Sequence, residues 1–294
     1  MLIVIDNRGQ MCNRMWAIAP FIALAKEYNK KIYILNFQEY KSYYRLTDDL
    51  VKFELLGNSI INELLKKVIR KIIKNGSVNT GKRLLDFLGI KHISKDTDLK
   101  QVHKFISENR TLIVEPWESM KDNTLLYKHK EFIKELFTPV KQYQDRIDNI
   151  FNTLRKKNQV IVGVHIRRGD YKSWKDGKYF YNDQVYAGMQ KQIQAQFPGQ
   201  PPVFYICSNE DITGDNYSGI DYYTSPKSHP VEDLYALSKC DYIIGPPSTF
   251  SMWASFYGNV PIYFIHDADS KIDLKDFSPI VHQNYKEDGS RLWI

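Results

Sequence analysis

The chain has 294 residues, a length that allows two compact domains. Its 43% hydrophobic and 26% charged content is ordinary for a globular protein and excludes the disordered and fibrous classes. Three cysteines form no CxxC pair and leave an odd number, which argues against a disulfide scaffold and favours free thiols in a reducing compartment.

The first 36 residues predict a β-loop-α-β unit that begins a parallel sheet. Residues 1–6 (MLIVID) and 31–36 (KIYILN) are apolar strands. Residues 15–31 predict a helix in which Pro20 marks a kink or the first turn. Charges occur too early for a signal peptide, and the uncharged run 15–25 is too short to span a bilayer, so we expect a cytoplasmic protein.

The polar turn at residues 9–14 is a candidate phosphate site. A helix N-terminus and its free N–H groups face a ligand at such a turn, which makes Cys12 and Asn13 candidate contacts. The turn lacks the GxGxxG pattern, so an ordinary strand–helix connection is the alternative.

The net charge of +7 is concentrated between residues 60 and 92, which hold eight Lys or Arg residues and two acids. Residues 61–74 (INELLKKVIRKIIK) alternate apolar and basic pairs and predict a basic amphipathic helix, within an insertion at about 55–100. One interpretation is a surface helix with a solvated basic face, and the other is peripheral contact with an anionic membrane. Nucleic acid is not expected, because aromatic residues are not interleaved with this basic patch.

A second α/β alternation follows a third strand at 111–117 and helical segments on both sides of Pro139. Its strands are predicted at 160–168, 203–209, 241–245 and 260–265, and its helices at 181–197, 231–240 and 248–258. We therefore expect two domains, residues 1–155 and 156–294, that face each other across a cleft.

Two adjacent arginines end the strand VIVGVHIRR (160–168). A buried strand that ends in Arg167, Arg168 and Asp170 predicts an anion site, because an unpaired guanidinium is costly to bury and fits phosphate bidentately. Ligands of open α/β sheets bind beyond the carboxyl ends of the strands. The alternative is an Arg–Asp pair that only braces a loop.

Other polar residues lie at strand ends and helix starts of the second half. Ser248 and Thr249 open a helix after a strand, where they cap it or hold a phosphate. Asp233 also opens a helix, where its carboxylate either complements the helix dipole or accepts the N1 and N2 hydrogens of guanine. His165 is a packed core residue or a site residue. The DxD strings at 96–98 and 267–269 are weak metal candidates, and we expect no metal.

Taken in order, these motifs resemble the inverting fucosyltransferases that share a His-x-Arg-Arg-x-Asp motif. The match to residues 165–170 is complete, and residues 232–240, 248–253 and 13–15 resemble further family blocks. The similarity is closest to the bacterial α1,2-fucosyltransferases of glycosyltransferase family 11.

The resemblance implies a GT-B-like α/β fold of two facing Rossmann-like domains with mostly parallel sheets and a cleft between them. Residues 1–155 would hold the acceptor and 156–294 the donor GDP-fucose, with no metal or other cofactor. Arg167 would neutralise the leaving diphosphate, Arg168 and Asp170 would orient Arg167 or the wall of the cleft, and Asp233 would bind guanine. His165, Ser248, Thr249, Cys12 and Asn13 would be the remaining donor contacts.

An inverting enzyme needs a base for the acceptor hydroxyl. Glu118 and Asp176 are candidates by location only. The expected acceptor is a polysaccharide, lipopolysaccharide-type or lipid-linked glycan, with α1,2 linkage. The alternatives are a GT-B glycosyltransferase with another nucleotide-sugar donor and a non-catalytic module that binds GDP or sugar.

Overall fold

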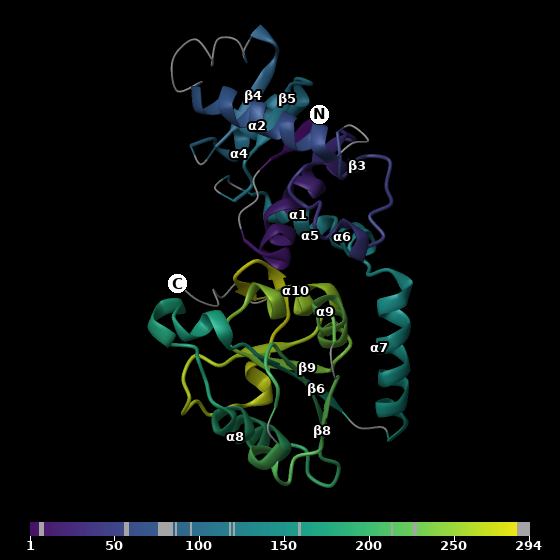
Figure 1. The fold of residues 1–294 in the computed structure, drawn as a ribbon, viewed down its shortest axis with the longest axis vertical. Coiled ribbons are helices and arrows are strands. Elements are labelled where there is room, and N and C mark those ends of the chain that lie inside the picture. Colours follow the sequence, from purple (N-terminus) through teal and green to yellow (C-terminus); the bar gives the residue numbers. More distant parts are fainter. Residues whose placement is uncertain are drawn as a thin grey trace. The chain divides into compact units, whose positions relative to one another are not determined.

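A computed structural model describes residues 1–5, 9–55, 59–75, 85, 87–94, 96–117, 119, 121–157, 160–212, 214–225 and 228–286. Contacts divide the chain into two compact units, Met1–Val140 and Lys141–Ile294, each with its own parallel sheet (Figure 1). The predicted α/β class with two Rossmann-like halves is confirmed. The division lies before residue 155, because the helix at 141–154 packs within the second unit. The cleft between the halves stays a prediction.

The first unit contains a five-stranded parallel sheet in the order β3-β2-β1-β5-β4. Its strands are β1 (Leu2–Val4), β2 (Ile32–Ile34), β3 (Val51–Lys52), β4 (Ile90–Ile93) and β5 (Thr111–Val114). The three central strands are the apolar runs that the sequence predicts. Strands β3 and β4 were not predicted, because edge strands are short and partly polar and give little periodic signal.

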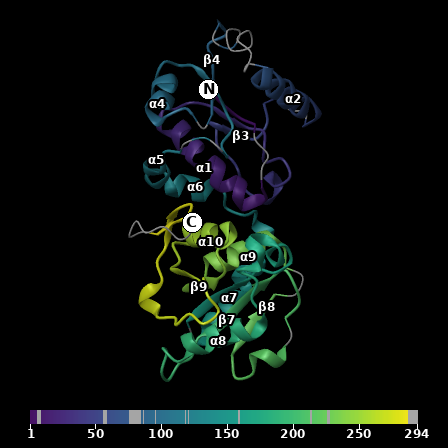
Figure 2. The same ribbon diagram turned by 90° about the vertical axis from the view of Figure 1, so that its left-hand side faces the viewer.

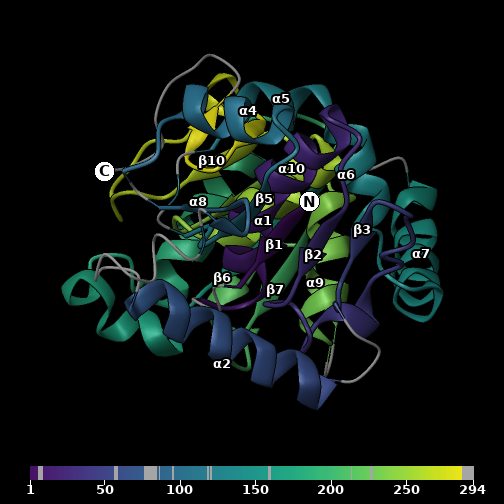
Figure 3. The ribbon, with the colours of Figure 1, turned by 90° about the horizontal axis from the view of Figure 1, so that it is seen from above.

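The helices of the first unit lie on both faces of this sheet. They are α1 (Met11–Glu27), α2 (Ser59–Asn75), α4 (Leu99–Ser107), α5 (Asn123–Lys128) and α6 (Lys130–Leu136), with a 3₁₀ turn at Lys41–Tyr43. Helix α2 lies on one side of the sheet, and α4 and α5 lie on the other (Figures 2 and 3). None of the described helices is long and apolar enough to cross a membrane.

Helix α1 begins at Met11, earlier than the expected residue 15, and continues through Pro20. Gly9 turns the chain at φ +75°, a conformation that favours glycine, and its carbonyl accepts a 3.0 Å hydrogen bond from Arg14 Nε. Cys12 and Asn13 therefore lie in the first helical turn and not in the predicted loop.

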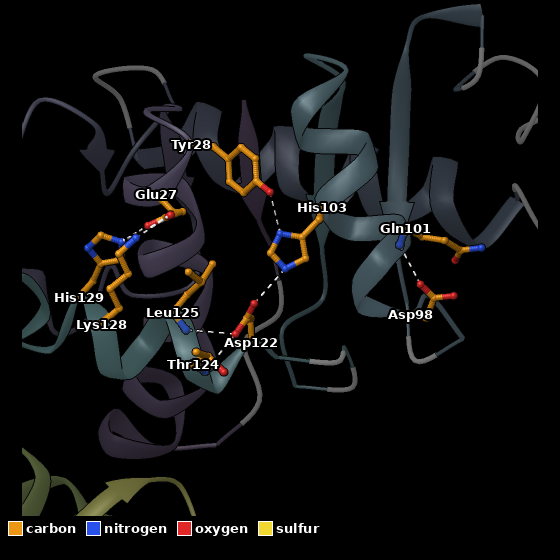
Figure 4. A network of polar contacts seen from close by, with 10 residues as sticks. All are labelled: Glu27, Tyr28, Asp98, Gln101, His103, Asp122, Thr124, Leu125, Lys128 and His129. Carbon is orange, nitrogen blue, oxygen red and sulfur yellow. Dashed lines mark hydrogen bonds and ion pairs between the residues drawn. The ribbon is translucent and has the colours of Figure 1, made fainter.

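A polar network fixes the end of α1 against α4 and α5 (Figure 4). The Tyr28 hydroxyl lies 2.9 Å from His103 Nδ1, and His103 Nε2 lies 2.9 Å from Asp122 Oδ2. Asp122 also caps α5, since its Oδ1 accepts two backbone N–H groups of that helix. Glu27 pairs with His129 at 2.7 Å. These short bonds connect the ends of three helices, α1, α4 and α5.

The second unit has the strand order β10-β9-β6-β7-β8, also all parallel. Its strands are β6 (Ile161–Ile166), β7 (Val203–Ser208), β8 (Tyr222–Thr224), β9 (Tyr242–Gly245) and β10 (Ile262–Phe264), followed by an antiparallel pair, β11 (Ile280–His282) and β12 (Tyr285–Lys286). This is the mononucleotide-binding order, and the chain reverses direction along the sheet between β6 and β9. Ligands bind at such a switch point, beyond the carboxyl ends of the strands.

Helices cover both faces of the second sheet. They are α7 (Lys141–Leu154), α8 (Asp183–Gln194), α9 (Pro230–Ser238) and α10 (Thr249–Gly258). Short 3₁₀ segments lie at Arg155–Lys157, Gly169–Lys172, Trp174–Gly177, Gly214–Tyr217 and Leu274–Asp276. Alternate residues of β6, such as Val162 and Val164, pack with the core residues of α8. On the opposite face, a Cβ at Gly163 would lie 2.7 Å from Leu237, so glycine lets α9 pack closely.

Candidate functional site

A pocket of about 740 Å³ lies within the second unit, where β6, β7 and β8 end and α9 and α10 begin. Both charge signs line it: Arg167 follows β6, and Asp233 lies in the first turn of α9. The rest of the lining comes from the ends of β7 and β8 and from the starts of the two helices: Ile206–Ile212, Tyr222, Thr224, Ser225, Ser228, Pro230 and Phe250, together with His165. Its volume suits a ligand of nucleotide size.

The two arginines of the motif point to opposite faces of the sheet. Arg167 lines the pocket. Arg168 instead pairs with Asp183 at the start of α8, and the Tyr217 hydroxyl donates a 2.9 Å hydrogen bond to the same carboxylate. The Arg168 backbone N–H donates to Asn209 Oδ1 at 2.9 Å. This is the alternation that adjacent strand residues require, and it leaves Arg167 alone of the pair on the pocket side.

The loop that follows β6 holds the Arg167 side chain in place. Its Nη2 lies 2.9 Å from Asp170 Oδ1, and its guanidinium carbon lies 5.8 Å from the centre of the Tyr171 ring. The Tyr171 hydroxyl in turn donates a buried 2.6 Å hydrogen bond to the Pro247 carbonyl. Burial raises the pKa of Tyr171 to about 12, so the hydroxyl keeps its proton. Tyr171 thus connects the loops that follow β6 and β9, on the two sides of the switch point.

Two adjacent carboxylates at the start of α9 have different environments. Glu232 accepts hydrogen bonds from Arg146 Nη1 at 2.9 Å and from the His229 backbone N–H at 2.8 Å, which makes it part of a capping box. Among the described residues, no ion pair reaches Asp233. Burial raises the pKa of Asp233 to about 6, while hydrogen bonds from Ser228 and Cys207 oppose this shift. Arg146 therefore pairs with Glu232, and the Asp233 carboxylate lines the pocket.

His165 lines the same pocket as an uncharged group. It is buried, its ring centre lies 5.1 Å from that of Phe250, and its Nδ1 has no hydrogen-bond partner among the described residues. Burial, and then the charge of Arg167, lowers the pKa of His165 to about 3, so the imidazole is uncharged at neutral pH. A Cβ at Gly245 would lie 2.6 Å from the His165 carbonyl oxygen, so glycine lets β9 approach β6 here.

Ser248 and Thr249 take the helix-start positions that the sequence predicts. Ser248 is the N-cap of α10, and its Oγ accepts a 3.2 Å hydrogen bond from the Phe250 backbone N–H. Phe250 lines the pocket, whereas Ser248 and Thr249 do not belong to its described lining. The capping role is thus observed, and phosphate contact by these hydroxyls stays a prediction.

The remaining predicted site residues lie elsewhere. Cys12 and Asn13 are in the first unit, whose placement relative to the pocket is not described. Glu118 lies outside the described residues. Asp176 lies in an exposed 3₁₀ segment and does not line the pocket. Neither DxD string forms a ligand cluster: Asp98 caps α4, Asp267 accepts the Asp269 N–H, and no group of three metal-binding side chains occurs among the described residues.

Several lining residues were not predicted from the sequence. Strand β8 supplies Tyr222 and Thr224, and its three residues are too short a run to be recognised. Ser228 and Cys207 contact Asp233 from a loop and from β7. The only sequence signal for this side of the pocket is the position of residues 204–210 at the carboxyl end of an apolar strand.

The fold and the pocket define a GT-B-like glycosyltransferase architecture with a nucleotide-sized, mixed-charge site in its second unit. Glycosyl transferase family 11 matches residues 119–278, more than half of the chain and all of the pocket. The chain belongs to this family.

Curated relatives agree with this assignment, and solved structures share the fold. Galactoside alpha-(1,2)-fucosyltransferase 1 of Sus scrofa is 25% identical over 180 residues, which cover 53% of this chain and 47% of the relative, and its Bos taurus counterpart is 26% identical over 204 residues, which cover 61% and 55%. The chain thus spans about half the length of the curated relatives it matches. Fucosyltransferase NodZ from Bradyrhizobium superposes with a TM-score of 0.56 at 15% identity, covering 90% of this chain and 94% of that chain. POFUT1 in complex with GDP-fucose gives 0.56 at 10% identity, with 90% and 97% covered.

Proposed function

We propose that the protein is an inverting fucosyltransferase that moves L-fucose from GDP-fucose to a hydroxyl of a glycan. One observation carries the proposal: a single pocket holds the Arg167 cation near strand β6 and the half-buried Asp233 carboxylate at α9. A guanosine diphosphate has complementary groups at its two ends, since guanine offers two N–H donors to a carboxylate and the diphosphate is an anion. Relatives named as fucosyltransferases, and neighbours solved with GDP or GDP-fucose, support the choice of donor.

In the proposed reaction, the acceptor oxygen attacks the anomeric carbon of fucose from the face opposite the diphosphate. The bond between the anomeric carbon and the diphosphate oxygen breaks, and GDP leaves with both bonding electrons. Arg167 stabilises the charge that develops on the leaving oxygens. Asp170 and Tyr171 contact the Arg167 guanidinium and hold it in place, and the ion pair between Arg168 and Asp183 fixes the loop.

The donor site would be completed by His165, by the hydroxyls of Ser248 and Thr249, and by Cys12 and Asn13 of the first unit. The base that removes the acceptor proton is proposed among Glu118 and Asp176 by their place in the sequence. No metal takes part in this proposal, because Arg167 supplies the positive charge that a divalent ion would provide.

Residues 1–155 would form the acceptor side and residues 156–294 the donor side. The acceptor would be a polysaccharide or lipid-linked glycan, and the linkage α1,2, as the names of the mammalian relatives suggest. A cytoplasmic protein in peripheral contact with the inner face of the membrane would meet such an acceptor where it is assembled.

Thermal denaturation with nucleotides tests the donor. GDP and GDP-fucose in the presence of EDTA should raise the melting temperature, because a ligand that binds only the folded state stabilises it by mass action. UDP compounds should not raise it. A larger shift with UDP compounds would show that the donor is a UDP-sugar and not GDP-fucose. No shift with any nucleotide would contradict the proposed function.

Arg167→Ala tests the mechanism. Loss of a positioned charge at the leaving group should lower the rate of GDP release from GDP-fucose by about 10²- to 10³-fold. The matched control is Arg155→Ala, which removes an arginine of the same unit that pairs with Asp241 away from the pocket lining. Normal turnover in Arg167→Ala would show that Arg167 does not stabilise the leaving group. If the wild type binds GDP but does not turn over GDP-fucose, the protein would instead be a binding module.

A further inference from the structure

Helix α2 turns two of its basic side chains toward its own unit and several apolar side chains toward solvent, while Ile69 and Ile73 pack against the core of that unit. The inward residues Lys66 and Arg70 contact backbone carbonyls, while Leu64 and Val68 are 56% and 53% exposed. This reverses part of the expectation from the sequence, in which the basic face of residues 61–74 is solvated. An amphipathic surface helix ordinarily buries its apolar stripe.

The inward face shows why Lys66 and Arg70 turn away from solvent. Lys66 is only 1% exposed; its Nζ donates to the Leu35 carbonyl at 3.2 Å and contacts Glu63. Arg70 Nη2 donates to the Ile5 carbonyl at 2.6 Å. These carbonyls directly follow β2 and β1, where parallel strands leave acceptors unpaired. The two cations therefore attach α2 to the carboxyl edge of the first sheet.

The outward face combines an apolar stripe with lysines. Ile60, Leu64 and Val68 follow one another at a spacing of four residues, which places them on one side of a helix, and Ile60 is 70% exposed. Lys67 and Lys71 are exposed at positions that adjoin this stripe. A monomeric protein rarely exposes large apolar side chains at successive turns of one helix, and such a stripe indicates an interaction surface.

We propose that this outer face of α2, formed by Ile60, Leu64, Lys67, Val68 and Lys71, binds the surface of an anionic lipid membrane. The helix would lie in the plane of the interface, with the apolar stripe among the acyl chains and the lysine ammonium groups at lipid phosphates. A second copy of the chain fits less well, because lysine is depleted from the cores of protein interfaces.

This inference does not depend on the donor site, since no residue of α2 belongs to the pocket. It does have a consequence for the acceptor side. Because Lys66 and Arg70 hold α2 to the carboxyl edge of the first sheet, membrane contact through α2 also brings that edge close to the lipid. A glycan attached to a lipid would then be presented to the part of the sheet where ligands of α/β proteins bind.

Co-sedimentation of the full chain with vesicles tests the proposal. Vesicles of equal parts phosphatidylglycerol and phosphatidylcholine should bind the protein, pure phosphatidylcholine should bind it much less, and added salt should weaken the binding. Leu64→Ser with Val68→Ser should lower the partition coefficient by about 10-fold or more. Lys67→Gln with Lys71→Gln should lower it by roughly 10- to 30-fold.

The matched control is Lys100→Gln with Lys104→Gln, which removes two exposed lysines from α4 of the same unit. It should bind vesicles like the wild type, and all variants should keep the wild-type melting temperature and GDP-fucose hydrolysis. If the control variant loses as much vesicle binding as the α2 variants, the binding depends only on the net charge of the protein, and the assignment to α2 is wrong. No binding to phosphatidylglycerol vesicles, or a dimer in light scattering that Leu64→Ser with Val68→Ser dissociates, would also overturn it.

Discussion

Asp233 should lower the stability of the free protein while it increases the affinity for GDP. Burial raises the pKa of Asp233 from 3.8 to about 6 in the folded protein. Because the folded state binds this proton more tightly than the unfolded state, the contribution of Asp233 to stability is greatest below about pH 4 and is lost as the pH rises through 6. A difference of about two units corresponds to roughly 3 kcal/mol. Asp233→Asn should therefore stabilise the free protein at pH 8 by up to about 3 kcal/mol and change it little at pH 4.

Binding of GDP should have the opposite pH dependence. The ionised carboxylate accepts the two guanine N–H groups, and the ionised fraction falls from about 90% at pH 7 to about 10% at pH 5 for a pKa of about 6. The affinity for GDP should therefore fall about tenfold between these pH values. His165 does not contribute, since its pKa of about 3 lies below this range. Titration calorimetry at both pH values measures the change.

Asp233→Asn also provides a control against misfolding. The amide keeps one acceptor but faces the guanine amino group with a donor, which should cost about 1 to 3 kcal/mol in GDP binding. Xanthosine diphosphate has a carbonyl at that position, so it should bind to Asp233→Asn more tightly than it binds to the wild-type protein. Two results would refute the assignment of Asp233 to guanine. One is an affinity for GDP that does not change with pH. The other is an Asp233→Asn variant that binds GDP as tightly as the wild type and does not bind xanthosine diphosphate.

Two further predictions concern the loops at the switch point. Tyr171→Phe leaves the buried Pro247 carbonyl without its donor and should lower the free energy of unfolding by about 1 to 3 kcal/mol in urea; an unchanged midpoint would mean that water replaces the hydroxyl. Gly245→Ala places a Cβ 2.6 Å from the His165 carbonyl oxygen and should destabilise the protein clearly. Gly188→Ala, in a helix with no atom within 4 Å of the new Cβ, should be neutral or stabilising, and equal effects of the two alanines would contradict the packing argument.

The architecture could be predicted where burial gives a continuous apolar run. Residues 160–168, 203–209 and 241–245 correspond to β6, β7 and β9, because central strands of a parallel sheet are buried on both faces. Strands β3, β4 and β8 lie at sheet edges and are short, so their pairing is decided by neighbours distant in sequence. The start of α1 was missed for a related reason: Gly9 and Arg14 fix it through a contact that no local pattern shows.

The site could be predicted only in part. The separation of Arg167 from Arg168 follows from strand geometry alone, and the observed partners of Arg168 agree with it. The difference between Glu232 and Asp233 could not be predicted, because both are acids in the first turn of a helix. It depends on Arg146 of α7, 86 positions before Glu232, which neutralises one carboxylate and leaves the other in the pocket.

The two charges of the pocket should act on different parts of the ligand, and a double-mutant cycle can show it. Arg167 follows β6 and Asp233 opens α9, so the two charges enter the pocket from different elements. If Arg167 holds the diphosphate and Asp233 the guanine, Arg167→Ala and Asp233→Asn should reduce GDP binding independently. Calorimetry should then give free-energy losses that add within about 0.5 kcal/mol in the double variant. Guanosine should respond to the Asp233 change alone and pyrophosphate to the Arg167 change alone. A large coupling energy would mean that both side chains contact the same group of the ligand, which would contradict the division of the pocket into a base end and a phosphate end.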